Sequence, residues 1–177
     1  KARKIQYNDK NEIYQADIIL KLLLQNKNIA LITDAGTPCI SDPGFRLVRL
    51  AHKNLIKVHT VPGPSSVIAA LSISGLPTDS FFFEGFLPRK KGRQQRLMFL
   101  STLPSTIIIF ESPYRITKTL IDIYSIFKNR WISICREMTK MHEEVINGWL
   151  EDIIDQENIK IKGEFVLVIA KSGFNND

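Results

Sequence analysis

Cysteine is scarce in this sequence: Cys39 and Cys135 are the only two among 177 residues, and they do not form a CxxC pair. A disulfide scaffold needs more cysteines, whereas two separate thiols suit a reducing compartment. We therefore expect a cytoplasmic protein. The three histidines, His52, His59 and His142, have no metal-ligand spacing, so we expect no structural metal.

Long hydrophobic runs are also missing. No stretch approaches the ~18 consecutive apolar residues that a membrane helix needs, and none is typical of a secretory signal. We therefore expect no membrane association. The sequence does have enough apolar residues, 44%, to bury a core, and its net charge is +6. A basic balance favours polyanionic partners.

Part of that charge is concentrated in residues 88–96, "PRKKGRQQR", where no acid interrupts the cations. The cations are Arg89, Lys90, Lys91, Arg93 and Arg96. One interpretation is a solvated loop. The other is a surface that contacts nucleic-acid phosphates, since each cation that neutralises a phosphate releases condensed counterions. The charge run alone leaves both open.

The first half of the chain alternates helical and strand-like segments. Apolar spacing predicts helices at 11–27, 43–53 and 66–74, the second of them capped by Asp42 with Pro43 at its first position. The apolar runs at 28–33 and 56–61 are typical of buried parallel strands. This rhythm predicts helices packed on a mostly parallel sheet.

The pattern changes after "GLPTDS". It predicts strands at 81–86, 105–112, 131–139, 143–148 and 164–171, and helices ending near Leu100, at 113–127 and in the short segment "WLEDIIDQ". The last three strands favour antiparallel pairing. With a boundary near 75–79, we expect an α/β protein of two α/β lobes, 1–77 and 78–177, with a cofactor cleft between them.

Three loops after predicted strands are candidate ligand sites. The first, residues 34–38, is rich in small residues that let backbone N–H groups approach a ligand. The second, 62–66, precedes a helix and has the N–H groups that bind anions. The third, 111–113, carries a carboxylate. Without a GK[ST] motif or a convincing Ser-His-Asp order, group transfer with a small cofactor is favoured over hydrolysis.

Six motifs resemble those of one family, in the same order and at similar spacings. They are "DAGTPCISDPG", "VPGPSS", "FEGFLPRKKGR", "FESPYR", "CREMTK" and "KGEFVLV". Together they resemble the tetrapyrrole methylase-like superfamily, and within it the branch of ribosomal RNA small subunit methyltransferase I, over residues 12–171. Family members begin with a strand and a small-residue loop that this sequence does not show. We therefore expect the first lobe to lack both.

The resemblance implies a cofactor, a reaction and residues for each. The cofactor is S-adenosyl-L-methionine, and the reaction is 2′-O-methylation of a cytidine ribose in 16S ribosomal RNA or the small ribosomal subunit. The implied cofactor-binding residues are Ala35, Gly36, Thr37, Ile40, Ser65, Ser66, Glu111 and Thr139.

A base that takes the proton of the ribose hydroxyl would help the reaction, and the candidates are Glu111, Glu137 and Lys140. Each is equally explained as an ion-paired or solvated side chain. The resemblance also implies a homodimer. Two alternatives stay open: a precorrin-type tetrapyrrole methyltransferase, and a non-catalytic RNA-binding or ribosome-assembly fragment.

Overall fold

The computed structural model describes residues 3–155 and 160–175 and divides the chain into two compact units, Lys1–Ser65 and Ser66–Asp177. The predicted lobe boundary lies further along the chain, near residue 77. The helix between the two positions, α3 (Ser66–Ile73), packs on the second unit's sheet through Val67, Ala70 and Leu71. The division into family lobes stays a prediction.

The first unit is built on two helices, α1 (Glu12–Leu24) and α2 (Phe45–Lys53). Ala16 and Ile19 of α1 pack against Leu47 of α2, which is the apolar contact that the helical spacing predicts. An ion pair between Glu12 and Arg46 joins the two helices at 2.6 Å.

The predicted strands at 28–33 and 56–61 are wrong, because both segments are irregular in the structure. An apolar run becomes a strand only where a neighbouring strand takes up its backbone hydrogen bonds. The described part of the first unit contains no strand. Ile32 and Val61, whose burial a sheet would require, are 83% and 88% exposed.

The start of α2 is also corrected. The helix begins at Phe45 after Gly44, and Asp42 makes no cap hydrogen bond. Its carboxylate instead accepts a hydrogen bond from the Thr33 hydroxyl at 2.9 Å, within the loop that precedes the helix. The polar side chain expected at the helix end therefore stabilises the loop.

The second unit is a five-stranded sheet in the order β1-β2-β5-β3-β4. The strands are β1 (Phe81–Phe86), β2 (Thr106–Glu111), β3 (Trp131–Arg136), β4 (Glu144–Trp149) and β5 (Phe165–Ile169). Strands β1 and β2 are parallel, while β5 pairs antiparallel with both β2 and β3, and β3 pairs antiparallel with β4. The predicted antiparallel group is confirmed.

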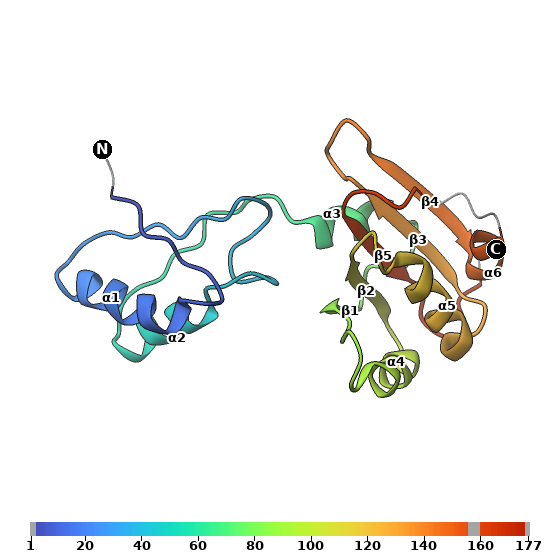
Figure 1. The fold of residues 1–177 in the computed structure, drawn as a ribbon, viewed down its shortest axis with the longest axis horizontal. Helices are drawn as coiled ribbons and strands as arrows, with labels where there is room; N and C mark the ends of the chain where they lie inside the picture. The colour runs from blue at the N-terminus through green and yellow to red at the C-terminus, as the bar shows by residue number, and fades with distance from the viewer. Residues whose placement is uncertain (1–2, 156–159, 176–177) are drawn as a thin grey trace. The chain divides into compact units, whose positions relative to one another are not determined.

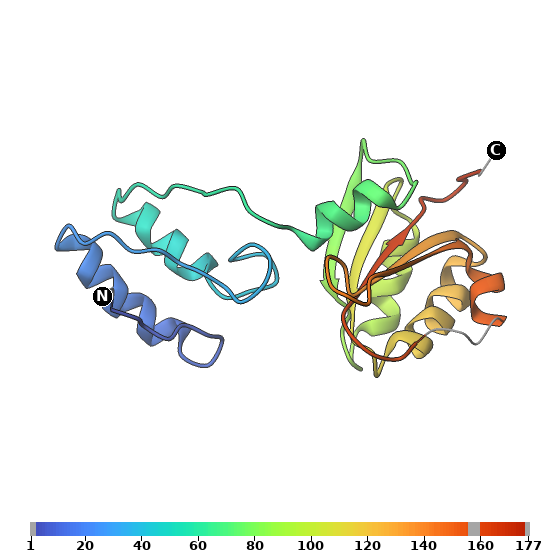
Figure 2. The same cartoon turned by 90° about the horizontal axis from the view of Figure 1, so that it is seen from above.

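Helices cover both faces of this sheet (Figures 1 and 2). On one face lie α4 (Arg93–Ser101), α5 (Ile116–Phe127) and α6 (Leu150–Asp155), and α3 lies on the other. Alternation along β2 serves both layers, because Ile107 and Ile109 face α4–α6 while Ile108 faces α3. The predicted α/β class is confirmed. The last residue of the predicted segment "WLEDIIDQ" lies outside the described residues.

Candidate functional site

The sheet brings four of the sequence motifs to one of its ends. Glu111, the last residue of β2, pairs with Phe165 at the start of β5, and Phe165 pairs with Arg136 at the end of β3. Arg136 in turn pairs with Glu144 at the start of β4. The loops 87–92, 112–115, 137–143 and 160–164 therefore meet at this end, which we call the motif end of the sheet.

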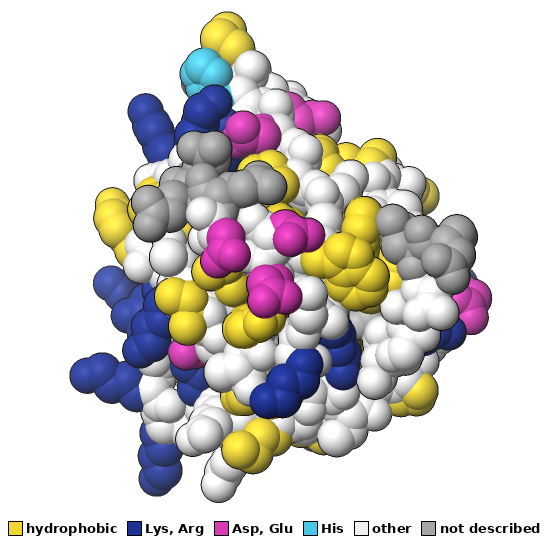
Figure 3. Space-filling model, turned by 90° about the vertical axis from the view of Figure 1, so that its right-hand side faces the viewer, with side chains coloured by type: hydrophobic (Ala, Val, Ile, Leu, Met, Phe, Trp, Pro, Cys, Tyr) yellow, Lys and Arg dark blue, Asp and Glu magenta, His cyan; other side chains and the backbone are white. Residues whose placement is uncertain are grey.

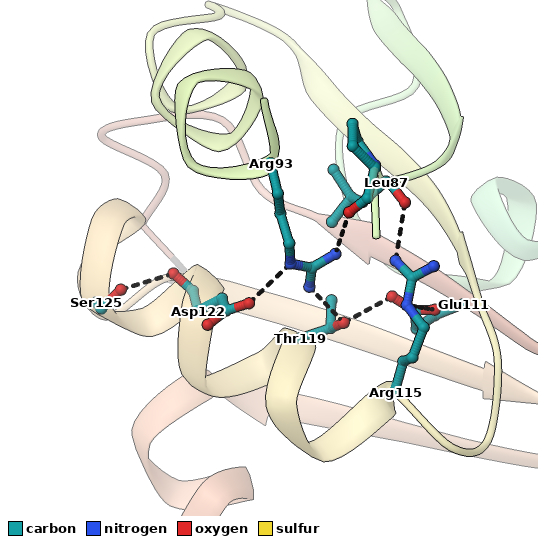
Figure 4. A network of polar contacts seen from close by, with 8 residues as sticks. Leu87, Arg93, Glu111, Arg115, Thr119, Asp122 and Ser125 are labelled. Atoms are coloured by element: carbon teal, nitrogen blue, oxygen red, sulfur yellow. Dashed lines mark hydrogen bonds and ion pairs between the residues drawn. The ribbon is translucent and has the colours of Figure 1, made fainter. Parts of the chain in front are cut away.

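A buried polar network joins two of these loops (Figure 4). The Arg93 guanidinium donates to the Pro88 carbonyl at 3.2 Å, to the Thr119 hydroxyl at 2.7 Å and to the Asp122 carboxylate at 2.8 Å. Arg115 donates to the Leu87 carbonyl at 2.8 Å. Two guanidinium groups from different helix starts therefore hold consecutive carbonyls just before the exposed cations of the basic stretch.

Glu111 is the acidic centre of this network. Its side chain is fully buried and accepts hydrogen bonds from the Ser112 backbone N–H at 2.8 Å and from the Thr119 hydroxyl at 2.6 Å. It also forms an ion pair with Arg115 at 3.2 Å. With these partners in place, the carboxylate stabilises the turn at the end of β2. Its predicted roles toward cofactor and proton stay predictions.

The basic stretch separates into inward and outward cations. Arg93 is buried, and Arg96 forms a two-pronged ion pair with Glu84 and lies over the rings of Phe82 and Phe99. The remaining three cations, Arg89, Lys90 and Lys91, have exposed side chains that pair with no group in the described part of the chain. On the face drawn in Figure 3, Lys and Arg side chains gather toward the left edge, apart from an acidic group near the centre.

Glu137 and Lys140 form a second polar cluster at the motif end. Lys140 donates to the Glu137 carboxylate at 2.9 Å and to the Glu164 carboxylate at 2.8 Å. Glu137 also accepts the Glu164 backbone N–H at 3.0 Å. Gly163 leaves room for this arrangement: its φ is +97°, and a Cβ there would lie 2.5 Å from the Glu137 side chain.

The opposite charges in this cluster shift the pKa values of Glu137 and Lys140 in opposite directions. The hydrogen bond from Lys140 lowers the pKa of Glu137, and the bonds to Glu164 and Glu137 raise the pKa of Lys140. Both shifts favour the charged forms. A carboxylate with a lowered pKa is a weaker base, and an ammonium with a raised pKa leaves less neutral amine to accept a proton near neutral pH. Their predicted roles as base stay predictions.

Thr139 lies in the exposed loop between β3 and β4 with a positive φ of +64°. Its backbone N–H donates to the Glu143 carboxylate, so a side chain from the same loop closes the loop. The Thr139 hydroxyl has no partner in the part of the chain that the structure describes. It is available to a ligand.

The remaining predicted cofactor residues belong to the first unit and to the start of α3. Ala35, Gly36 and Ile40 are exposed, and the Thr37 hydroxyl donates to the Pro64 carbonyl at 3.0 Å. The loop 34–40 is therefore tied to the turn 62–65. Ser65 ends the first unit and Ser66 begins the second. The structure brings together the two loops that the sequence predicts for the cofactor's methionine end.

Sequence reasoning missed Arg115, Thr119, Asp122 and Glu164 as members of these networks. Arg115 had a local signal, since it lies four residues after Glu111. The partners of Arg93 and Lys140 come from elements 29 and 24 positions away. No spacing rule connects such positions before the fold is known. Within the described residues, no cluster of three or more potential metal ligands occurs, and no helix is long and apolar enough to cross a membrane.

Comparison with known proteins defines the class of this fold. A family model described as "Tetrapyrrole (Corrin/Porphyrin) Methylases" matches residues 1–154. The chain resembles the crystal structure of the methyltransferase CobJ at a TM-score of 0.68, with 15% identity, covering 94% of this chain and 74% of that one. It also resembles uroporphyrin-III C-methyl transferase from Thermus thermophilus complexed with S-adenyl homocysteine, at a TM-score of 0.62 and 15% identity, covering 93% and 75%. The chain belongs to the tetrapyrrole methylase family.

More similar relatives carry one name, "Ribosomal RNA small subunit methyltransferase I". The relative from Halalkalibacterium halodurans is 43% identical over 97% of this chain, and that from Xylella fastidiosa is 46% identical over 90%. The relative from Hydrogenobaculum sp. is 44% identical over 94% of this chain. The chain spans 60% of the length of the first two relatives and 74% of the third. The family resemblance predicted from the six motifs is confirmed.

Proposed function

We propose that this chain acts in S-adenosyl-L-methionine-dependent 2′-O-methylation of a cytidine ribose in small-subunit (16S) ribosomal RNA. The observation that carries the proposal is the similarity of 43–46% over nearly the whole chain to relatives named for methylation of that RNA. The exposed cations Arg89, Lys90 and Lys91 support it, because they leave positive charge free for phosphates.

The loops of the first unit have small residues and exposed backbone, which suit the methionine moiety of the cofactor. Ala35 and Gly36 are small and exposed, and an added Cβ at Gly36 would meet no atom within 4 Å, so a ligand has room against this backbone. Main-chain N–H groups in such a loop suit the carboxylate of a methionine moiety. We assign Ala35, Gly36, Thr37 and Ile40, with Ser65 and Ser66, to the methionine end of the cofactor.

On the second unit we assign Thr139 to the adenosine end, through its free hydroxyl. We assign Glu111 to the same end as a positioning residue, since its carboxylate holds the turn that follows β2. When bound, the cofactor supplies a methyl group on a positively charged sulfur, which is a good leaving group. The chain contributes by holding the ribose hydroxyl in line with that methyl group.

Phosphate binding orients the substrate in this proposal. Arg89, Lys90 and Lys91 take the phosphates, whereas Arg93 and Arg96 already have internal partners and fix the loop from within. Among the three candidate bases we favour Glu137, because its carboxylate is partly exposed at the motif end, whereas that of Glu111 is buried. Glu111 and Lys140 remain candidates, the former limited by burial and the latter by its charge.

The partner in this account is 16S ribosomal RNA or the small subunit, the working form is a homodimer, and the compartment is the cytoplasm. Two free thiols, one buried and one partly buried, suit a reducing compartment. The homodimer follows from the family resemblance and from apolar side chains exposed along edge strand β1.

Calorimetric titration with S-adenosyl-L-methionine tests the proposal. We expect saturable binding by the full chain. No binding heat, with RNA binding retained, would favour the alternative of a non-catalytic RNA-binding protein. Cofactor binding without any RNA affinity, combined with affinity for a tetrapyrrole, would favour the tetrapyrrole methyltransferase.

A further inference from the structure

Tyr114 is an aromatic side chain at the motif end that nothing in the described chain covers. It is 94% exposed, more than any other exposed aromatic residue described, and it makes no hydrogen bond or ring contact with the described residues. Exposing an aromatic ring to water is unfavourable in free energy, and this ring contributes nothing to the packing of the described residues. A ligand that covers the ring removes this cost.

The turn that carries Tyr114 is fixed. The backbone N–H groups of Arg115 and Ile116 both donate to the Ser112 carbonyl, at 3.0 and 3.1 Å. The Arg115 side chain is further held by Glu111 at 3.2 Å. The ring therefore projects from a turn with little backbone freedom, so that binding a ligand there orders few additional groups.

The same turn is bonded to the root of the outward cations. Arg115, the residue after Tyr114, donates to the Leu87 carbonyl at 2.8 Å, two residues before Arg89 (Figure 4). Arg93 holds the next carbonyl, that of Pro88, at 3.2 Å. Tyr114 and the exposed cations Arg89–Lys91 thus come from two loops that are joined at their bases and lie at the same end of the sheet.

Exposed cations and a free aromatic ring on two joined loops match single-stranded nucleic acid. The phosphates are attracted to the cations, and an unpaired base stacks on the ring. A purely apolar protein partner would leave three cations to be desolvated without partners. The pairing of charge and ring therefore favours a nucleic-acid strand over a protein surface.

We propose that Tyr114 stacks on an unpaired base of the RNA whose phosphates lie on Arg89, Lys90 and Lys91. This inference rests on the proposed function, because it takes RNA as the substrate. It adds a requirement for an unpaired base, which phosphate contacts alone do not impose. The ring contributes affinity for single strands, and the cations contribute affinity for single strands and duplexes alike.

The test uses the full chain and a short single-stranded RNA that carries a fluorescent purine analogue whose emission is quenched by stacking. Tyr114→Ala and Tyr114→Phe are compared with the parent, and Tyr14→Ala, which removes an exposed tyrosine of the first unit, is the matched control. Binding to the duplex of the same sequence is measured in parallel. Circular dichroism and light scattering check folding and oligomeric state.

We expect Tyr114→Ala to weaken single-strand binding about ten-fold or more and to abolish the quenching. Tyr114→Phe and Tyr14→Ala keep both, duplex affinity stays unchanged, and the salt dependence of binding is kept. Equal affinity of Tyr114→Ala and parent overturns the inference, as does an equal loss in Tyr114→Phe, which would indicate a hydroxyl contact. A change of oligomeric state in Tyr114→Ala overturns it in favour of a protein partner.

The outcomes separate this inference from the proposed function. Suppose that the parent binds RNA with a marked salt dependence and that Tyr114→Ala binds it equally well. The stacking role then fails and the proposed function stands. If the parent binds neither the single strand nor the duplex, both fail together.

Discussion

The backbone at Gly36 is the residue-scale feature that the cofactor assignment depends on most. Its φ is +72°, in the left-handed region, and its Cβ position faces open space. A branched side chain at such a position costs of order 1–3 kcal/mol in backbone strain and also fills the space that a ligand would use. The loop can relieve the strain only by moving its N–H groups.

We therefore predict that Gly36→Val abolishes S-adenosyl-L-methionine binding while the protein stays folded. Calorimetric titration measures the binding, and circular dichroism checks the fold. Gly173→Val is the matched control, because Gly173 has a φ of +73° and equally open surroundings but lies outside the predicted site. Unchanged cofactor affinity in folded Gly36→Val would contradict the assignment.

Arg136 and Glu144 form the ion pair that closes the motif end between β3 and β4, at 2.8 Å. Arg136 is buried and Glu144 is partly exposed. The hydrogen bond from Arg136 lowers the pKa of the Glu144 carboxyl. Since the folded pKa is below the unfolded one, this contribution to stability is present above about pH 4.3 and is lost as pH falls through the folded pKa.

We predict that Glu144→Gln lowers the free energy of unfolding by about 1 kcal/mol at pH 7, and that the difference from the parent shrinks as pH falls below about 4.3 and through the folded pKa. Urea unfolding followed by tryptophan fluorescence measures it, because the two tryptophans, Trp131 and Trp149, lie on β3 and β4. Asp79→Asn, which removes an exposed carboxylate of the same unit, is the control. A difference that stays the same at every pH from 7 into the acid range would argue against the ion pair.

At the scale of elements, the loop after β1 acts as a unit with the start of α5. Its root is held by Arg93 and Arg115, and its outward cations pair with none of the residues that the structure describes. An anchored loop keeps these side chains near one another, which is the arrangement that cooperative phosphate contacts require. The affinity for RNA should therefore depend on this loop more than on cations elsewhere.

We predict that replacing Arg89, Lys90 and Lys91 by Ala weakens RNA binding and leaves cofactor affinity nearly unchanged. Each lost phosphate contact should reduce the slope of log affinity against log salt by roughly 0.7–0.9. RNA affinity at several salt concentrations measures this. The control replaces Lys128 and Lys171, which follow α5 and β5 at the opposite end of the sheet. If the triple variant keeps the parent slope, the loop is a solvated surface.

Much of the second unit could be predicted from its sequence, because most of its strands are largely apolar runs between turn residues and find partners within the same unit. The runs at 28–33 and 56–61 look equally strand-like, but an apolar run does not encode whether a neighbouring strand is present. Among the described residues, no strand lies next to either run. Local patterns predicted the strands of the second unit and failed at these two runs, because strand formation depends on pairing that a local pattern does not encode.

The candidate site likewise has a part that the sequence could predict and a part that it could not. The loops at strand ends were predictable, since small residues, turn-formers and charges follow apolar runs. The burial of Arg93 was not, because it depends on Asp122 in another helix, and neither was the pairing of Arg96 with Glu84 on a neighbouring strand. In the basic stretch, the sequence alone could not separate the cations with internal partners from those with exposed side chains.

At the scale of the whole molecule, β1 lies at an edge of the sheet, since among the described strands it pairs with β2 alone. Phe81 and Phe86 on this strand are 41% and 57% exposed, and Phe99 of α4 is 44% exposed. The apolar strand β2 lies inside the sheet and cannot itself form an interface. Exposed aromatic residues along an edge strand favour association.

We predict a homodimer, with a mass twice the 20.2 kDa of one chain. Light scattering over a wide concentration range measures it. Phe81→Asp should shift the protein toward the monomer, because a charge on the edge strand opposes pairing. Ile13→Asp, which changes an exposed apolar residue on α1, is the control. A monomer mass at every concentration would rule the prediction out.

Methyl transfer to a ribose of small-subunit ribosomal RNA, the reaction that we propose, is tested by following a labelled methyl group from S-adenosyl-L-methionine into that RNA. A 2′-O-methyl group blocks alkaline cleavage at its own nucleotide, because the neighbouring phosphate loses its internal nucleophile. We predict label in the RNA, recovered after alkali in a dinucleotide that begins with methylated cytidine. Label on a base, or no label in RNA from a preparation that binds both cofactor and RNA, would contradict the claim.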